Sequence, residues 1–520
     1  MENTIFSLLP PVLAIVMVIL TRRVLLSLGV GILAAAFLLA DFKIGKTFSI
    51  AWGALSGNVY TRTDGAFEWS EWNLYIIFFL LILGIVTAFI TISGGSRAFG
   101  EWAVTRVKSR TGAQVMAALL GILIFIDDYF NALAVGQVSR PITDRHRISR
   151  AKLAYIIDST SAPVCVVAPV SSWGAYIIGL IGTILTAHQV TDLTAFSAFM
   201  QMIPMNYYVW AALGMVFLVA VLNRDFGPMK KHENRAVQTG EVVFSGREIP
   251  GELKEDLPVS DRGTIGGLVW PIVALIIGTV AAMLFTGSKA AGEGADIFAI
   301  FENTDVAKSL FIGGVIGLIT ALVVFARQAA VFPEGAGAVL GKGIAEGIKS
   351  MLPAVYILFL AWTIVALIGE LGTGTYLAGL VEKSDLNIGF LPMILFVTAG
   401  IMAFATGTSW GSFGILLPIA GEIAAATDIS LLLPALAAVL AGAVFGDHCS
   451  PISDTTILSS TGAGSNHIDH VMTQIPYALV SALAAAAGYL VLGFTENIFL
   501  GLAVTILLLV MFAFILKRTK

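Results

Sequence analysis

The stretch GDHCSPISDTTILSS, residues 446–460, decides how this sequence folds. Apolar segments flank it, with LLLPALAAVLAGAVF at 431–445 and VMTQIPYALVSALAAAAGYLVLGF at 471–494. Both have the character of membrane-spanning helices. The stretch between them carries two aspartates, a histidine, the helix-breaking Pro451 and several hydroxyl groups. Such a polar interruption predicts a helix that is deliberately broken at membrane depth.

The composition indicates that the whole chain is built for a bilayer. Of its 520 residues 57% are hydrophobic and only 12% are charged, and the mean hydropathy is +0.89. A soluble globular protein carries roughly 25% charged residues. The two cysteines, Cys165 and Cys449, lie inside apolar segments, so no disulfide framework is expected. We therefore expect an all-α polytopic protein whose main partner is the lipid bilayer, with no nucleic acid and no cofactor.

Apolar runs recur along the entire length and predict about eleven transmembrane helices. Two of the spans, 151–186 and 430–461, contain breakers and predict discontinuous helices. Two further apolar segments, 112–140 and 389–426, are broken in the middle and are interpreted as re-entrant helical hairpins. The uninterrupted helices are expected near 5–21, 24–41, 73–95, 206–222, 264–286, 308–326, 351–370, 471–493 and 497–516.

The distribution of basic residues supports this number of crossings. With the N-terminus outside and the C-terminus in the cytoplasm, 24 of the 30 Lys and Arg residues fall in inside loops. The loop 140–152 is strongly basic, with Arg140, Arg145, Arg147, Arg150 and Lys152. Treating either hairpin as a full crossing would place a basic loop on the wrong side. The expected location is a bacterial inner membrane.

The two halves of the chain resemble each other in the order of these features. FIDDYFNALAVGQVSRPI at 125–142 corresponds to MAFATGTSWGSFGILLPI at 402–419, and the breaker at 158–163 corresponds to that at 447–451. Five crossings per half force the second half upside down, which predicts an inverted-topology repeat. The expected units are 5–222, a cytoplasmic connector at 223–263, 264–493, and an extra C-terminal helix with its tail at 494–520.

Each half offers a polar cluster rich in oxygen atoms, which hard cations prefer as ligands. A buried carboxylate without Lys or Arg is costly in a membrane, and a bound cation or proton compensates it. We expect Na⁺ at the clusters around Asp158 and Asp447. The candidate residues of the first half are Asp127, Asp128, Asn131, Asp158, Ser159, Thr160 and Ser161. Those of the second half are Thr406, Thr408, Ser409, Trp410, Asp447, His448, Ser450, Ser453, Asp454 and Thr455.

Several of these polar and aromatic residues also have a purely structural interpretation. Asp127 or Asp128 could cap a helix, single hydroxyls usually bond to their own helix, and Trp173, Tyr176 and Trp410 could pack or line a pocket. His467, Asp469 and His470 precede a helix in an inside loop and are expected to be solvated. Gly407–Gly411 matches the G-x-S-x-G motif of serine hydrolases, but that motif needs a strand before its turn. A channel is possible, although two symmetric clusters suit alternating access better.

The motifs GDHCSPISDTTILSS and FIDDYFNALAVG, at 446–460 and 125–136, resemble the NhaC-type sodium/proton antiporter family of the ion transporter superfamily. This resemblance covers most of the chain. It implies a bacterial inner-membrane carrier with 11 to 12 helices, and the wider superfamily implies a mobile transport domain and often a homodimer. The same resemblance includes carriers of amino acids, malate and lactate.

The predicted function is secondary active transport, with sodium/proton antiport by elevator-like alternating access, and not enzymatic catalysis. The alternative is sodium- or proton-coupled transport of a small organic solute such as an amino acid or a carboxylic acid. An organic anion would be attracted by helix N-termini near Ser409 and Trp410.

Overall fold

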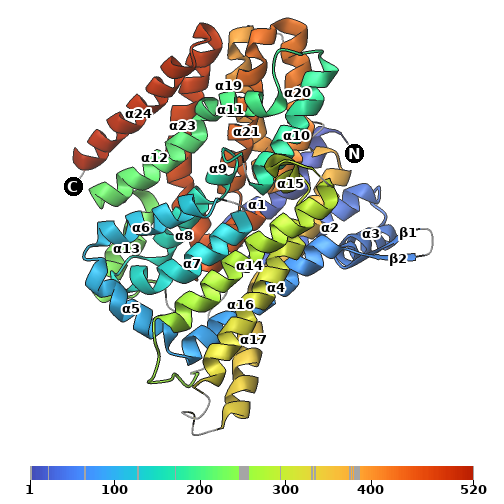
Figure 1. Ribbon diagram of the computed structural model, residues 1–520. Helices are drawn as coiled ribbons and strands as arrows, with labels where there is room; N and C mark the ends of the chain where they lie inside the picture. The colour runs from blue at the N-terminus through green and yellow to red at the C-terminus, as the bar shows by residue number, and fades with distance from the viewer. Residues whose placement is uncertain are drawn as a thin grey trace.

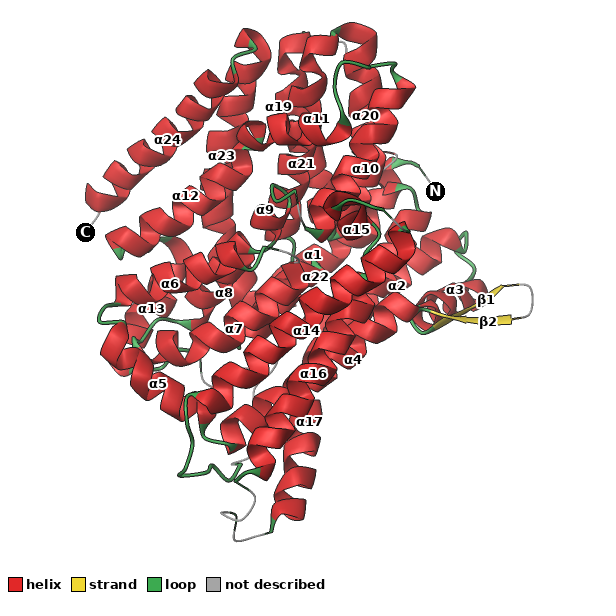
Figure 2. Ribbon diagram, viewed as in Figure 1, coloured by secondary structure: helices red, strands yellow, loops and turns green. Residues whose placement is uncertain are grey.

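The structure, a computed structural model, describes most of the chain (Figure 1). It leaves out residues 1–2, 22, 64–65, 126–127, 170, 245–256, 293, 329–331, 333–334, 374–375, 377–378, 380–386 and 519–520. The described part is helical except for one small antiparallel hairpin, which projects at the edge of the molecule (Figure 2). Its strands, β1 (Tyr60–Thr63) and β2 (Ala66–Trp69), pair Tyr60 with Trp69.

The first part of the chain begins with four helices. They are α1 (Leu9–Thr21), preceded by η1 (Ile5–Leu8), α2 (Val24–Leu39), α3 (Ile44–Gly57) and α4 (Glu71–Ile92). The helices that follow are α5 (Gly95–Arg106), α6 (Arg110–Leu123), α7 (Asp128–Arg145), α8 (Arg150–Thr160), α9 (Ala162–Cys165), α10 (Ser172–Ala187), α11 (Ala195–Met202), η2 (Ile203–Met205), α12 (Tyr207–Leu222) and α13 (Gly227–Thr239).

The second part of the chain starts with long helices. They are α14 (Gly266–Ala291), the short α15 (Ile297–Glu302), α16 (Val306–Ala326) and α17 (Ala336–Glu370). The remaining elements are η4 (Ile388–Phe390), α19 (Leu391–Thr406), α20 (Ser409–Thr427), η5 (Ile429–Leu431), α21 (Leu432–Cys449), α22 (Asp454–Ala463), α23 (His467–Thr495) and α24 (Ile498–Arg518).

The all-α polytopic fold class is confirmed. Nine helices in the described ranges are long and apolar enough to cross a membrane. The apolar parts of the first two expected spans, Ile5–Met17 and Leu25–Leu39, are shorter than those nine, so the number eleven stays a prediction. Helix α17 begins at Ala336, well before the expected residue 351. The sequence placed the start too late because the first turns of the helix carry Lys342, Glu346 and Lys349 and so lack the apolar character of a span.

The chain is interrupted at the four segments where the sequence places breakers. The span 151–186 is divided into α8, α9 and α10, and the span 430–461 into α21 and α22. Helix α6 ends at Leu123 and α7 begins at Asp128, and α19 and α20 flank Gly407 and Thr408. Gly407 has φ +73°, a left-handed conformation that glycine adopts without steric cost. The re-entrant course of both helix pairs in a bilayer stays a prediction.

Two groups of helices meet at these interruptions. Helices α4, α14, α16 and α17 lie side by side as one layer (Figure 1). Helix α19 packs along α21, and α22 packs against α7 and α8. Glycines permit the close approach: a Cβ on Gly446 would lie 2.0 Å from the carbonyl oxygen of Gly400, and one on Gly136 would lie 2.3 Å from the carbonyl carbon of Gly462. Small residues at such contacts are typical of packed membrane helices.

Three loops that the sequence assigns to the inside gather at one end of the bundle. The backbone amide of Arg150 donates to the carbonyl of Val242 at 3.0 Å, and its guanidinium donates to the carbonyl of Gly464 at 3.3 Å. Lys152 belongs to the same basic segment but is fully buried, with an ion pair to Asp225. Elsewhere, the amide of Asn3 bonds to the carbonyl of Leu371, which places the N-terminal segment beside the C-terminal end of α17.

Candidate cation and solute site

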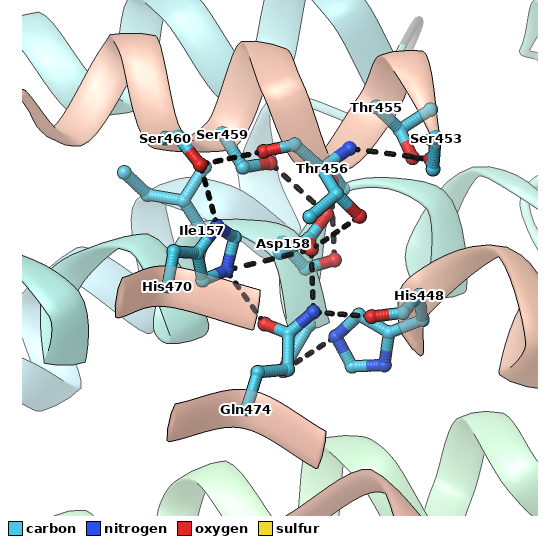
Figure 3. Close-up of polar contacts among 12 residues, drawn as sticks. Ile157, Asp158, His448, Ser453, Thr455, Thr456, Ser459, Ser460, His470 and Gln474 are labelled. Atoms are coloured by element: carbon cyan, nitrogen blue, oxygen red, sulfur yellow. Dashed lines mark hydrogen bonds and ion pairs between the residues drawn. The ribbon is translucent and has the colours of Figure 1, made fainter. Parts of the chain in front are cut away.

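Asp158 lies on the last turn of α8, and its carboxylate points into the second half of the chain (Figure 3). Its Oδ1 accepts a hydrogen bond from the Ser459 hydroxyl at 3.0 Å. Its Oδ2 accepts one from the Thr456 hydroxyl at 3.1 Å and one from the Gln474 amide at 2.7 Å. His470 Nε2 lies 3.6 Å from the same oxygen. Both oxygens of Asp158 are therefore already engaged by donors from α22 and α23.

Gln474 and two histidines extend this network. The Gln474 amide nitrogen also donates to the carbonyl of His448, and its Oε1 lies 2.7 Å from His470 Nε2. The His448 ring lies 3.1 Å from the Ser159 hydroxyl through Nε2 and 2.7 Å from the Tyr208 hydroxyl through Nδ1. All of these side chains are buried. The network joins the break in the first half to the break in the second half.

Asp447 occupies the last turn of α21 and differs from Asp158 in one respect. Its Oδ2 accepts hydrogen bonds from the backbone amide of Ser409 at 3.1 Å and from the Ser409 hydroxyl at 2.7 Å. Its Oδ1 is buried and has no hydrogen-bond partner among the described residues. Asp447 is 1% exposed, so water does not replace the missing partner at the surface. This oxygen is the strongest indication of a site for a positively charged ligand.

No lysine or arginine pairs with these carboxylates in the described part of the chain. The ion pairs of Asp158 there are limited to the contact with His470, and Asp447 and Asp454 have none. A buried charge without a partner is energetically costly. A proton or a metal cation could supply the compensation. Among the described residues there is no group of three His, Cys, Asp or Glu side chains placed to hold a metal ion.

Asp454 and Asp128 belong to a third location, beside the breaks and facing the layer of α4 and α17. Asp454 accepts a hydrogen bond from the Tyr129 hydroxyl, and Asp128 Oδ1 accepts one from Trp173 Nε1 at 2.9 Å. Both carboxylates line a cavity of about 410 Å³ together with Thr408 and Trp410. Trp410 is held by rings behind it: Trp173 at a centroid distance of 5.8 Å and Tyr176, stacked on it, at 4.7 Å.

Several other predicted site residues bond mainly to their own surroundings. The Asn131 amide donates to the carbonyls of Gly121, Ile124 and Thr160 and so braces the first break. The hydroxyls of Thr160, Ser161 and Thr406 bond to carbonyls three or four residues earlier. Ser450 bonds to the carbonyl of Phe404, and Ser453 caps α22 while it contacts Thr455. Asp127 lies outside the described residues.

The expectation that the loop before α23 is solvated is wrong for its side chains. His467 is 2% exposed, Asp469 5% and His470 0%. They are buried because they form the first turn of α23, which packs against the second break, where His467 Nε2 lies 2.8 Å from the carbonyl of Pro451. Sequence reasoning also missed Gln474, Thr456 and Ser459. Gln474 could have been noticed as a lone amide inside an apolar span, four residues after His470.

The two predicted clusters are therefore not two equivalent pockets. The carboxylate of the first half, Asp158, is surrounded by side chains of the second half. The carboxylate of the second half, Asp447, is bound by the turn between α19 and α20. Asp128 and Asp454, one from each half, share the cavity. The structure thus brings the polar groups of both halves into one continuous region.

The model of the Na⁺/H⁺ antiporter family matches residues 164–494 of this chain. A Haemophilus influenzae protein described as uncharacterized is 47% identical over 522 residues, which cover 99% of this chain and 96% of that protein. A second Haemophilus influenzae protein, described as an uncharacterized Na⁺/H⁺ antiporter, is 36% identical over 154 residues, covering 29% of this chain and 32% of its own length. The malate-2H⁺/Na⁺-lactate antiporter of Bacillus subtilis is 35% identical over 165 residues, covering 30% of this chain and 33% of its own length.

Proposed function

Because the chain belongs to the Na⁺/H⁺ antiporter family, and is a secondary transporter and not an enzyme, we propose that it exchanges sodium ions for protons. The observation that carries this proposal is the buried Oδ1 of Asp447, which has no partner among the described residues. An oxygen of this kind accepts either a proton or a sodium ion. One carboxylate does not hold both well at once, since each neutralises the same charge, and this competition couples the two ions.

The surroundings of Asp447 supply further ligands for sodium. The Ser409 hydroxyl already lies 2.7 Å from Oδ2, and the chain ends its helical hydrogen bonding at Ser450. Hydroxyl and carbonyl oxygens complete the shell that a hard cation prefers. In this proposal Asp158 has a different role. Three hydrogen-bond donors, Thr456, Ser459 and Gln474, hold its carboxylate in place, so that it fixes the geometry between the two breaks.

Alternating access would follow from movement of the interrupted units against the layer of α4, α14, α16 and α17. The contact of α7 with α22 through Gly136 and Gly462 would keep the units of both halves together during that movement. Inverted repeats with discontinuous helices at the site are the architecture of many secondary transporters. We therefore retain elevator-like movement as part of the proposal, to be tested by cross-linking α17 to α22 with cysteines, which should stop transport reversibly.

The test of sodium–proton exchange uses the purified full chain in proteoliposomes that contain a pH-sensitive dye. A pulse of sodium chloride should move protons with no organic solute present, and Asp447→Asn should abolish this flux. Asp296→Asn is the matched control, because Asp296 is exposed and caps α15 in a role that asparagine also fills. Normal flux in Asp447→Asn would refute the assignment of the site.

The second candidate function is sodium-coupled or proton-coupled transport of a small organic solute. It is favoured by the cavity beside the breaks and by the similarity to an antiporter that is named for malate and lactate. The discriminating measurement is sodium flux with and without added solutes. Flux that requires a solute would favour this second function over sodium–proton exchange.

We place the protein in a bacterial inner membrane with its N-terminus outside. The distribution of Lys and Arg among the loops supports this orientation. The gathering of the loop at 146–150, Gly464 and the connector at one end is consistent with it. A homodimer is part of the proposal, and native mass spectrometry of the detergent-solubilised protein would test it.

A further inference from the structure

The cavity beside the interruptions has walls from both groups of helices. The layer contributes Trp72 and Asn73 from α4 and Ala361, Trp362 and Val365 from α17. The interrupted units contribute Asp128, Tyr129, Gly407, Thr408, Trp410, Ile452 and Asp454. The cavity thus lies between the layer and the interrupted units, the two parts that move against each other in the proposed mechanism.

The size and the lining of the cavity fit an organic molecule. Its volume of about 410 Å³ lies within the range of small-molecule sites, which are mostly apolar with a few polar groups. A sodium ion is bound mainly by a shell of oxygen atoms, whereas an organic molecule also gains from burying its apolar surface against aromatic side chains. Three tryptophans, Trp72, Trp362 and Trp410, line the cavity. Trp72 is 45% exposed, so the cavity reaches the surface at the N-terminal end of α4.

The charge of the lining indicates a cation. Asp128 and Asp454 are both present, and none of the described lining residues is Lys, Arg or His. The faces of tryptophan rings also attract positive charge, so the aromatic walls and the carboxylates favour the same kind of ligand. Because Asp454 is held by Tyr129 and Asp128 by Trp173, the two carboxylates keep fixed positions in the cavity wall.

The helix N-termini at this place already lie beside acidic groups of the chain, which weakens the attraction for an anion that the sequence suggested. Helix α7 begins with Asp128 and α22 begins with Asp454, so each already has a carboxylate in its first turn. The first amide of α20, that of Ser409, donates to Asp447. Each of these N-termini thus already has an acidic group of the chain beside it, and the charged groups that a carboxylate solute would meet among the described lining residues are both negative.

We propose that this cavity binds a small organic ammonium ion, with its charged group near Asp128 and Asp454 and its apolar part against the three tryptophans. The proposal rests on the second candidate function, the coupled transport of a small organic solute, and names the class of that solute. Its test measures binding without any gradient, and it does not involve Asp447. The two proposals can therefore fail separately.

The test uses the full chain in lipid nanodiscs and isothermal titration calorimetry, with the heat from empty nanodiscs subtracted. Three probes of one shape are compared: benzylammonium, benzyl alcohol and benzoate. We expect benzylammonium to bind saturably, benzyl alcohol to bind at least roughly tenfold more weakly than benzylammonium, and benzoate not to bind. The reason is that only the ammonium ion finds groups of opposite charge in the cavity. Equal binding of the three probes, or a preference for benzoate, would overturn the proposal.

Two variants locate the binding in this cavity. Asp454→Asn and Trp362→Leu should each weaken benzylammonium binding by roughly tenfold, since they remove a charge and an aromatic face. Trp270→Leu is the control, because Trp270 is 63% exposed on α14 and does not line the cavity. Gel filtration and thermal unfolding establish that each variant is folded. Unchanged binding in a folded Trp362→Leu protein would show that benzylammonium binds elsewhere and would refute the assignment to this cavity. If Asp454→Asn does not fold, the comparison of the three probes still decides the charge preference.

Discussion

Gln474 and Asp158 are 316 residues apart in the chain and are joined by a 2.7 Å hydrogen bond from the Gln474 amide to Oδ2 of Asp158. The bond connects α23 of the second half to α8 of the first half. Because the same amide also donates to the carbonyl of His448, one side chain fixes both helix interruptions.

The first prediction concerns this side chain. Gln474→Ala should lower the free energy of unfolding by about 2–4 kcal/mol, because it removes one of the two donors to the buried Oδ2 of Asp158 and takes from the His448 carbonyl and from His470 Nε2 their contacts with the amide. The measurement is the thermal unfolding midpoint of the detergent-solubilised protein. Gln201→Ala is the control, since Gln201 is exposed on α11. Equal midpoints for the two variants would show that the network contributes no stability.

A second prediction follows from the contact of α7 with α22. Gly136→Ala would place a Cβ 2.3 Å from the backbone of Gly462, so the helices must separate, at a cost of about 1–3 kcal/mol. Gly337→Ala should have the opposite sign and stabilise by about 0.5–1 kcal/mol, because Gly337 lies in α17 with no neighbouring atom within 4 Å. Unfolding midpoints of both variants test this difference. A midpoint for Gly136→Ala at or above that of the unaltered protein would contradict the close packing.

The third prediction compares two ion pairs. Lys152 is completely buried and pairs with Asp225, which also accepts a hydrogen bond from the Tyr477 hydroxyl at 2.7 Å. Lys152→Met should destabilise the protein by about 3–5 kcal/mol because Asp225 is left as a buried charge without its cation. Arg97 and Asp261 form an exposed pair, so Arg97→Met should change stability by less than about 1 kcal/mol. Similar losses of stability in the two variants would show that burial does not determine how much an ion pair contributes to the stability of this protein.

The fourth prediction concerns orientation in the membrane. A cysteine in place of Lys289, exposed at the C-terminal end of α14, should react with a membrane-impermeant maleimide added to intact spheroplasts. A cysteine in place of Lys342, exposed near the start of α17, should react only after the membrane is opened. Cys165 and Cys449 are buried and give a low background. The reverse labelling pattern would invert the proposed topology.

The sequence by itself determined the class of fold and the positions of the interruptions. Apolar length and the scarcity of charge require membrane helices, and Pro451 and Gly407 among polar residues mark where helices end, because these are local properties of the chain. The start of α17 and the helices α3, α5 and α13 were not predicted, because these segments are too short or too polar to be recognised as membrane spans.

Only the tertiary structure decided which polar groups share one place. The sequence assigns Asp158 to a cluster with its neighbours, but its partners Thr456, Ser459 and Gln474 come from helices about 300 residues away. It also expects His470 to be solvated, whereas His470 lies in the first turn of α23 and is buried against the second break. The physical reason is that the pattern of one segment records its own environment, while the partner of a buried polar group is set by how distant helices pack. The unpaired oxygen of Asp447 and the charge of the tryptophan-lined cavity are consequences of that packing.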